Sequence, residues 1–235
     1  MVRVLKSRLS IALIFAAAIV GLGFVTNVST KVTGEDSVVF QISFGLKKSQ
    51  AIGLSYDEEL LLIKSVQQAV FDVAPVGAPI PERSPREPID LIRNRSGLCF
   101  DRSRTFDKVF NYLGFKTRHV YILYPGNPVT KEAMPYWKAL ITRGTASHAV
   151  TEVKTQRGWV VVDSNTPWIS VTTDGRPVES NQIFASQKEF ENMPSDFQTP
   201  FKAYKGLYSR RGQFYRPYIP LPQFNWADYF NSFID

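Results

Sequence analysis

The segment around the single cysteine, Cys99, constrains the fold of this chain more than any other feature of the sequence. Apolar side chains recur after it at the three- and four-residue spacings of one helical face, and Cys99 lies on that face. Gly114 is a favourable C-terminal stop, while Ser96 and Gly97 suit a turn before the helix. The pattern therefore predicts a helix whose first turn carries the thiol.

A thiol in the first turn of a helix ionises more easily than an ordinary one. Unpaired backbone N–H groups and the helix dipole favour an anion there. The cations Arg95, Arg102 and Arg104 add positive potential if they point toward the sulfur. These conditions lower the pKa of a thiol and make it a nucleophile. The alternative is an inert buried cysteine that packs as a small hydrophobe, which is the usual outcome when no partner groups follow in the sequence.

Two strand patterns downstream of Cys99 supply such partners. Residues 147–153 alternate in polarity and carry His148 near their start, and after a polar loop residues 158–162 lead into Asp163. A histidine can act as the general base for a thiol, and a carboxylate can fix the tautomer of the histidine. With His148 opposite Asp163 in a hairpin, the loop spans residues 154–157, which is an ordinary length. A register shifted by one residue would place the two side chains on opposite faces.

Four motifs of this chain, in this order, resemble the transglutaminase-like superfamily, whose core is papain-like. They are Gly97–Asp101 at the helix start, then Leu113–Val120, Ser147–Ala149 and Gly158–Asp163. The resemblance covers about residues 58–168. It implies an α+β fold in which helices pack on an antiparallel sheet and the nucleophilic cysteine lies at a helix N-terminus.

The same resemblance implies a role for each of three residues. Cys99 would be the nucleophile, His148 the base and acid, and Asp163 the group that orients His148. The chain lacks an acidic calcium loop and the extra domains of the calcium-dependent transglutaminases. It also lacks the acidic pair beside the cysteine of the bacterial periplasmic adhesin-cleaving relatives, which Asp101 matches only in part, so their substrate is not carried over.

The N-terminal segment combines three cations, Arg3, Lys6 and Arg8, with an apolar run over residues 11–25. This pattern is typical of an export signal or a single membrane anchor, and the lack of an Ala-x-Ala cleavage site favours an anchor. The positive-inside rule then puts the domain outside the cytoplasm, in the periplasm, or makes it secreted if the signal is cleaved. A lone cysteine in an exported protein cannot form an internal disulfide, which makes a chemical role for Cys99 more plausible.

The division of the chain follows from these segments. We expect residues 1–30 to be the signal or anchor and residues 31–235 to be one transglutaminase-like domain. Its aromatic and proline-rich C-terminal extension covers about residues 180–235. The rings of this extension either bind a partner or wrap the core, and wrapping is the favoured interpretation.

Other patterns predict the scaffold. Alternation over Ser37–Leu46 predicts a half-buried strand. A capping box at Ser55 predicts a helix that ends near Phe71. Three further elements are expected: a short helix over residues 88–93, a strand over residues 117–124, and a short helix over residues 134–140 within a long loop.

Three residues of these elements bear on the site. His119 lies in mid-strand, which favours a structural role over a catalytic one. Tyr136 and Trp137, on the short helix of the long loop, either line an acyl-binding groove or pack the loop onto the core.

The sequence predicts thiol-dependent transfer or hydrolysis of an amide acyl group, on a peptide or other amide or on a cell-envelope protein. The alternative is a catalytically silent module that binds an envelope partner. The net charge of +7 comes without a basic stripe interleaved with aromatics, so no nucleic-acid partner is expected. No cofactor is expected, and two histidines with one cysteine do not make a zinc site. The negatively charged carbonyl oxygen formed in this reaction needs two hydrogen-bond donors, and we expect the second of them in the region of Gln67, Gln68 and the linker after them.

Overall fold

A computed structural model describes residues 26–81, 84–127, 129–142, 144–210, 213–214 and 223–231, together with residues 20, 21 and 23. The helices are α2 (Gly34–Phe44), α3 (Tyr56–Val73), α4 (Pro88–Asn94), α5 (Cys99–Leu113), α6 (Tyr136–Ile141) and α7 (Trp226–Asn231), with 3-10 turns η1 (Gln187–Glu189) and η2 (Ser195–Phe197). The strands are β1 (Lys116–Leu123), β2 (Ser147–Thr155), β3 (Gly158–Val162), β4 (Lys202–Lys205), β5 (Leu207–Arg210), β6 (Gln213–Phe214) and β7 (Gln223–Phe224).

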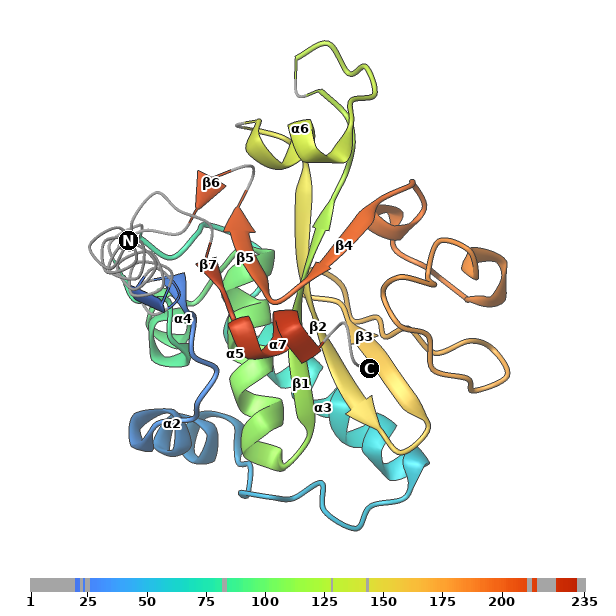
Figure 1. Cartoon of the computed structure of the whole chain (residues 1–235). Helices are drawn as coiled ribbons and strands as arrows, with labels where there is room; N and C mark the ends of the chain where they lie inside the picture. Colours follow the sequence, from blue (N-terminus) through green and yellow to red (C-terminus); the bar gives the residue numbers. More distant parts are fainter. Residues whose placement is uncertain are drawn as a thin grey trace, which may run out of the picture.

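The fold is α+β, as predicted, with helices packed on a four-stranded antiparallel sheet of order β3-β2-β1-β4. Because successive side chains of a strand point to opposite faces, the sheet contributes side chains to two hydrophobic cores. Val160 and Val162 of β3 face a core shared with α2, α3 and α5, whereas Val161 faces a second core. Figure 1 shows α2, α4 and α5 on one side of the sheet and the segment after β3, drawn in orange, on the other.

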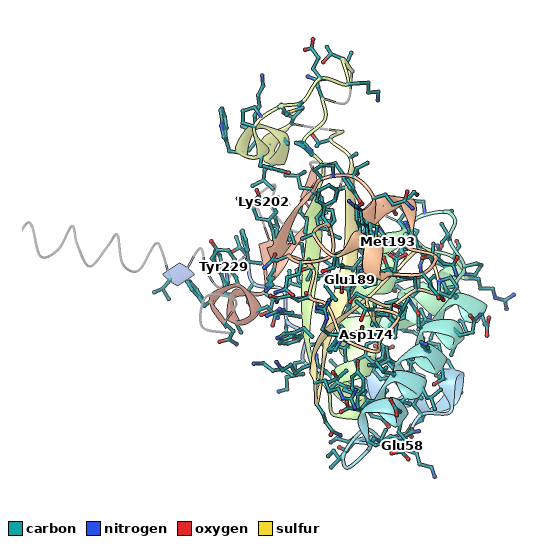
Figure 2. All side chains as sticks on the ribbon, turned by 90° about the vertical axis from the view of Figure 1, so that its right-hand side faces the viewer. Glu58, Asp174, Glu189, Met193, Lys202 and Tyr229 are labelled. Carbon is teal, nitrogen blue, oxygen red and sulfur yellow. The ribbon has the colours of Figure 1, made fainter. Side chains whose placement is uncertain are left out.

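The second core is covered by the C-terminal extension, which confirms the wrapping interpretation for the part of the extension that the structure describes. Phe197 is fully buried there, and Phe201 packs against the same cluster. Figure 2, which looks onto this side, shows Asp174, Glu189 and Met193 in front of the sheet. Tyr208 is also buried. The predicted aromatic positions Tyr215 and Tyr218 lie outside the described residues.

The strand predicted over Ser37–Leu46 is wrong, because this segment forms helix α2. Local capping outweighs the alternating pattern. The Oδ2 atom of Asp36 accepts a hydrogen bond of 2.8 Å from the backbone N–H of Thr33, and Thr33 Oγ1 accepts one of 3.1 Å from the N–H of Asp36. Gly45 then ends the helix in the left-handed conformation, at φ 65°.

The β2–β3 hairpin forms, but its predicted register is wrong by two positions. The structure pairs Thr151 with Val162 and Thr155 with Gly158, so the turn has two residues instead of four. Gly158 adopts φ 149°, a conformation that favours glycine and permits the tighter turn. A shift of two positions preserves the side-chain face, so His148 and Asp163 stay on the same side of the sheet.

The other predicted helices are confirmed within a residue or two. Helix α3 starts at the Ser55 capping box and continues to Val73, and α5 runs from Cys99 to a left-handed cap at Gly114. The long loop carries α6 at its predicted place, with the ring of Trp137 68% exposed. Trp137 therefore does not pack the loop onto the core.

The N-terminal apolar run lies mostly beyond the part of the chain that the structure describes. Within that part, none of the helices has the length and apolar character needed to cross a bilayer.

Helix α2 yields a direct test, since Phe40 and Ile42 would share a face in a strand but do not in the helix. Phe40 is fully buried, whereas Ile42 is 79% exposed. Phe40→Ala should lower the free energy of unfolding by about 3–5 kcal/mol through the cavity that it leaves. Ile42→Ala should change it by no more than about 0.5 kcal/mol. Equal losses in urea unfolding would favour the strand instead.

Candidate active site

Cys99 occupies the first helical position of α5, as predicted, but the cap comes from a different residue than expected. The N-cap residue is Leu98, whose backbone N–H donates a hydrogen bond of 3.0 Å to Asp101 Oδ2. The Oδ1 atom of Asp101 forms a buried ion pair of 2.6 Å with Arg86. Space at Gly97 is tight, because an added Cβ would lie 2.6 Å from a methyl group of Leu91 and would force that buried side chain to move. The helix start that carries the thiol is therefore held by the contacts of Asp101 and by the close packing of Gly97.

The structure brings His148 and Asp163 into direct contact and places Cys99 beside them. The Nε2 atom of His148 donates a hydrogen bond of 2.5 Å to Asp163 Oδ1, and both side chains are buried. The thiol of Cys99 interacts with the same imidazole, and each of the two groups shifts the pKa of the other. All three residues predicted from the sequence thus meet at one place.

The electrostatics of the three groups favour a charged pair. Burial raises the pKa of the Cys99 thiol, but the hydrogen bond and positive charge of His148, with backbone hydrogen bonds at Ala149 and Phe100, outweigh burial and lower it. Burial lowers the pKa of His148, but the charge and hydrogen bond of Asp163, together with Cys99, raise it to about 10. Thiolate and imidazolium therefore coexist between the lowered pKa of the thiol and about pH 10.

Asp163 keeps its charge in this buried site. Burial raises the pKa of its carboxyl group, but the charge and hydrogen bond of His148 and hydrogen bonds from Thr166 and Asn165 lower it overall. The hydroxyl of Thr166 donates to Asp163 Oδ2 over 2.6 Å, and the backbone N–H of the same residue donates over 2.9 Å. One carboxylate oxygen thus faces the imidazole while the other is held by the loop.

Gln67 fixes this loop from the far side, a role that the sequence did not reveal. Its Nε2 atom, on α3, donates to the carbonyl oxygens of Asp163, Thr166 and Trp168 at 2.7, 3.1 and 2.9 Å. The amide of Gln68 instead donates to Asp72 over 2.7 Å at the surface. The amide of Gln67 is therefore committed to the loop after β3, and the second oxyanion donor stays unassigned.

Arg102 ties the cysteine helix to the same loop. Its fully buried guanidinium donates to the carbonyl oxygens of Ser164 and Gly97 and, over 2.8 Å, to Asn165 Oδ1. The amide of Asn165 lies 3.5 Å from the Nδ1 atom of His148. Arg102 therefore couples the helix start, the loop after β3 and the edge of the imidazole.

The other two cations considered near the thiol do not set its charge state. Arg104 forms an ion pair of 2.9 Å with Glu87, and Arg95 is the exposed C-cap of α4. The identified causes of the thiol shift are burial, His148 and backbone donors. The ionisation of Cys99 therefore depends chiefly on the imidazole.

His119 has the structural surroundings expected for it. Its ring stacks on Tyr208 with centroids 3.9 Å apart, and its Nδ1 atom lies 2.9 Å from Ser103 Oγ. The carboxylate of Asp107 lies 3.4 Å from the same nitrogen and accepts a hydrogen bond from Tyr208. Across the ranges that the structure describes, no group of three or more potential metal ligands occurs.

Comparison with known proteins identifies a family for the core of the chain. Residues 49–164 match the family model of the transglutaminase-like superfamily, which confirms the resemblance seen in the sequence. A solved structure described as "Crystal structure of a TGase" is similar at 17% sequence identity and a TM-score of 0.36. The similarity covers 66% of this chain and 37% of that one, so the chain spans little more than a third of its length. No curated protein matches the sequence.

The first prediction from this site concerns the thiol. Wild-type Cys99 should react with iodoacetamide at about pH 6, where an ordinary thiol with a pKa of about 8.5 is almost fully protonated. The thiolate is lost only as the pH falls through its lowered pKa. His148→Gln removes the main cause of that shift, so its rate at the same pH should fall at least about tenfold.

Cys99→Ser supplies the background, since the chain has no other cysteine. A wild-type rate that rises only near pH 8.5, and that His148→Gln leaves unchanged, would contradict the charged pair.

The second prediction concerns the loop support. Gln67→Ala removes a buried side-chain donor from three carbonyl oxygens, of which those of Thr166 and Trp168 keep a backbone donor. The free energy of unfolding should therefore drop by about 1–3 kcal/mol. Gln68→Ala removes a neighbouring exposed amide and should change it by no more than about 0.5 kcal/mol. Urea unfolding of both variants compares them, and equal stabilities would show that Gln67 does not hold the loop.

Proposed function

Because residues 49–164 form a domain of the transglutaminase-like superfamily, we propose that this chain is a thiol enzyme acting on amides through Cys99, His148 and Asp163. The observation that carries the proposal is the buried contact of 2.5 Å between His148 and Asp163, beside the Cys99 thiol whose pKa the same imidazole lowers. Buried ionisable groups with shifted pKa values, one of them a thiol at a helix start, are typical of a catalytic site.

The reaction follows from the positions of these groups. The Cys99 thiolate attacks the carbonyl carbon of an amide, and the carbonyl oxygen becomes an oxyanion. The imidazolium of His148 gives its proton to the leaving nitrogen, so the C–N bond breaks and a thioester and a free amine result. Water or an acceptor amine then attacks the thioester, with the neutral imidazole taking the proton, and the thiolate is restored. Asp163 holds the ring and stabilises its positive form throughout.

The start of α5 provides one donor for the oxyanion. The first N–H groups of a helix have no intrahelical acceptor, and that of Cys99 lies next to the sulfur. The helix dipole favours negative charge at the same point.

Hydrolysis of a peptide or other amide is the favoured outcome, and transfer to an amine is the second. A cell-envelope protein is the proposed macromolecular substrate, since the N-terminal cations and apolar run favour a membrane-anchored chain with its domain on the outer side. Trp226 supports a link between that run and the domain, because its Nε1 atom donates to Gly23 O and Thr26 Oγ1, each over 3.1 Å.

A silent binding module is the second candidate function. It is favoured by the ring cluster around α7, in which Trp226 stacks on Phe224 with centroids 4.6 Å apart and Phe230 is 58% exposed. An exposed aromatic edge of this kind suits a partner surface.

One experiment separates these functions. Intact cells that express the full chain are treated with a membrane-impermeant electrophilic probe that carries an amide-like acyl group. Wild-type chain should be labelled at Cys99 and recovered in the membrane fraction. Cys99→Ala should lose all labelling and turnover while its circular dichroism spectrum stays native, because Cys99 is half-buried and not part of the main core.

Mass spectrometry of the acyl group trapped on Cys99 then identifies the acyl part of the substrate. Turnover that persists in Cys99→Ala would exclude the thiol mechanism. A thiol that reacts only as an ordinary one, in a chain that still binds envelope material, would favour the silent module. Labelling that requires broken cells would contradict the proposed outer location.

A further inference from the structure

Asp196 lies on η2, in the C-terminal extension and beyond the residues that match the family model. Its Oδ2 atom is 3.9 Å from the Nδ1 atom of His148, on the side of the ring away from Asp163. We propose that Asp196 is a specificity residue that makes this cleft prefer substrates with a positive charge beside the reacting amide. This inference rests on the proposed function, since it concerns the same cleft.

The position of Asp196 is set by its neighbours. The hydroxyl of Tyr124 donates a hydrogen bond of 2.6 Å to the backbone carbonyl of Asp196. The next residue, Phe197, is fully buried, and its ring meets that of His148 edge-on with centroids 6.0 Å apart. Phe197 also packs on Trp168 at 4.9 Å. The backbone of Asp196 is thus anchored at the imidazole, although its side chain is 41% exposed.

The ionic neighbours of Asp196 differ from those of other carboxylates that follow β3. Two other carboxylates that follow β3 are paired with cations. Glu179 pairs with Arg118 and Lys205, and Glu189 pairs with Arg176. Within the part of the chain that the structure describes, no lysine or arginine pairs with Asp196, whose one ionic neighbour there is His148.

The chemistry of the site places a substrate nitrogen near this carboxylate. Nε2 of His148 is committed to Asp163, so Nδ1 is the atom that exchanges a proton with the sulfur and with the leaving or incoming amine. A group 3.9 Å from Nδ1 is within a few ångströms of that amine. Across about 6 Å, in partly solvated surroundings, a unit negative charge changes the relative binding of a cation and an anion by about tenfold.

A merely structural role for Asp196 makes a different prediction. If its charge only tuned the imidazole, reagents of every charge would gain or lose reactivity together. A specificity role changes the ratio between cationic and anionic reagents of similar size. The ratio therefore separates the two roles without knowledge of the natural substrate.

The test uses Cys99, the only cysteine, as the reporter. The full chain is treated with methanethiosulfonates that carry a trimethylammonium group, a sulfonate group or a neutral methyl group, and each charged rate is divided by the neutral one. Wild type should favour the cation over the anion. Asp196→Asn should reduce that cation-to-anion ratio about tenfold, and Asp196→Lys should reduce it further.

Glu191→Gln is the matched control, because it removes an exposed negative charge from the same segment and should leave the ratio unchanged. A ratio that Asp196→Asn does not alter, in a chain whose thiol still reacts at about pH 6, would overturn the specificity role alone. A thiol that shows only ordinary reactivity would instead overturn the proposed function and, with it, this inference.

Discussion

The account of this molecule depends on the charged contact between the imidazole of His148 and its two neighbours, the Cys99 thiol and the Asp163 carboxylate. Burial opposes every charge in this group, since it disfavours the thiolate, the imidazolium and the carboxylate alike. The charges persist because each lies within hydrogen-bonding reach of the next. The same burial makes their mutual attraction stronger than it would be in water.

Long buried side chains hold the three groups together. Gln67 reaches from α3 to three carbonyl oxygens of the loop after β3, and Arg102 reaches from α5 to the same loop. Each satisfies acceptors that would otherwise be costly to bury. The C-terminal extension adds a third support, because the ring of Phe197 packs edge-on against that of His148. The geometry of the site therefore depends on packing against both faces of the sheet. It also depends on Phe197, which lies outside the residues that match the family model.

The sequence predicted what periodicity and local chemistry determine. Helix α5 and its Gly114 cap follow from spacing. The shared face of His148 and Asp163 was a hypothesis about register, and it survives because a strand keeps its faces under a shift of two positions. The exact pairing was missed since several loop lengths satisfy the same alternation. The segment of α2 was misassigned because its alternation was accidental, while the Thr33–Asp36 cap carried the stronger signal. Gln67 and Asp196 could not be found, since their contacts with the site join residues far apart in the chain.

The most direct test of the charged pair is the ultraviolet absorbance of the thiolate, followed as a function of pH in a chain with one cysteine. Native protein should show this absorbance at about pH 6 and keep it until the pH falls through the lowered pKa of Cys99, whereas His148→Gln should show it only as the pH approaches about 8.5. Identical titrations of the two proteins, both with an ordinary thiol pKa, would contradict the account.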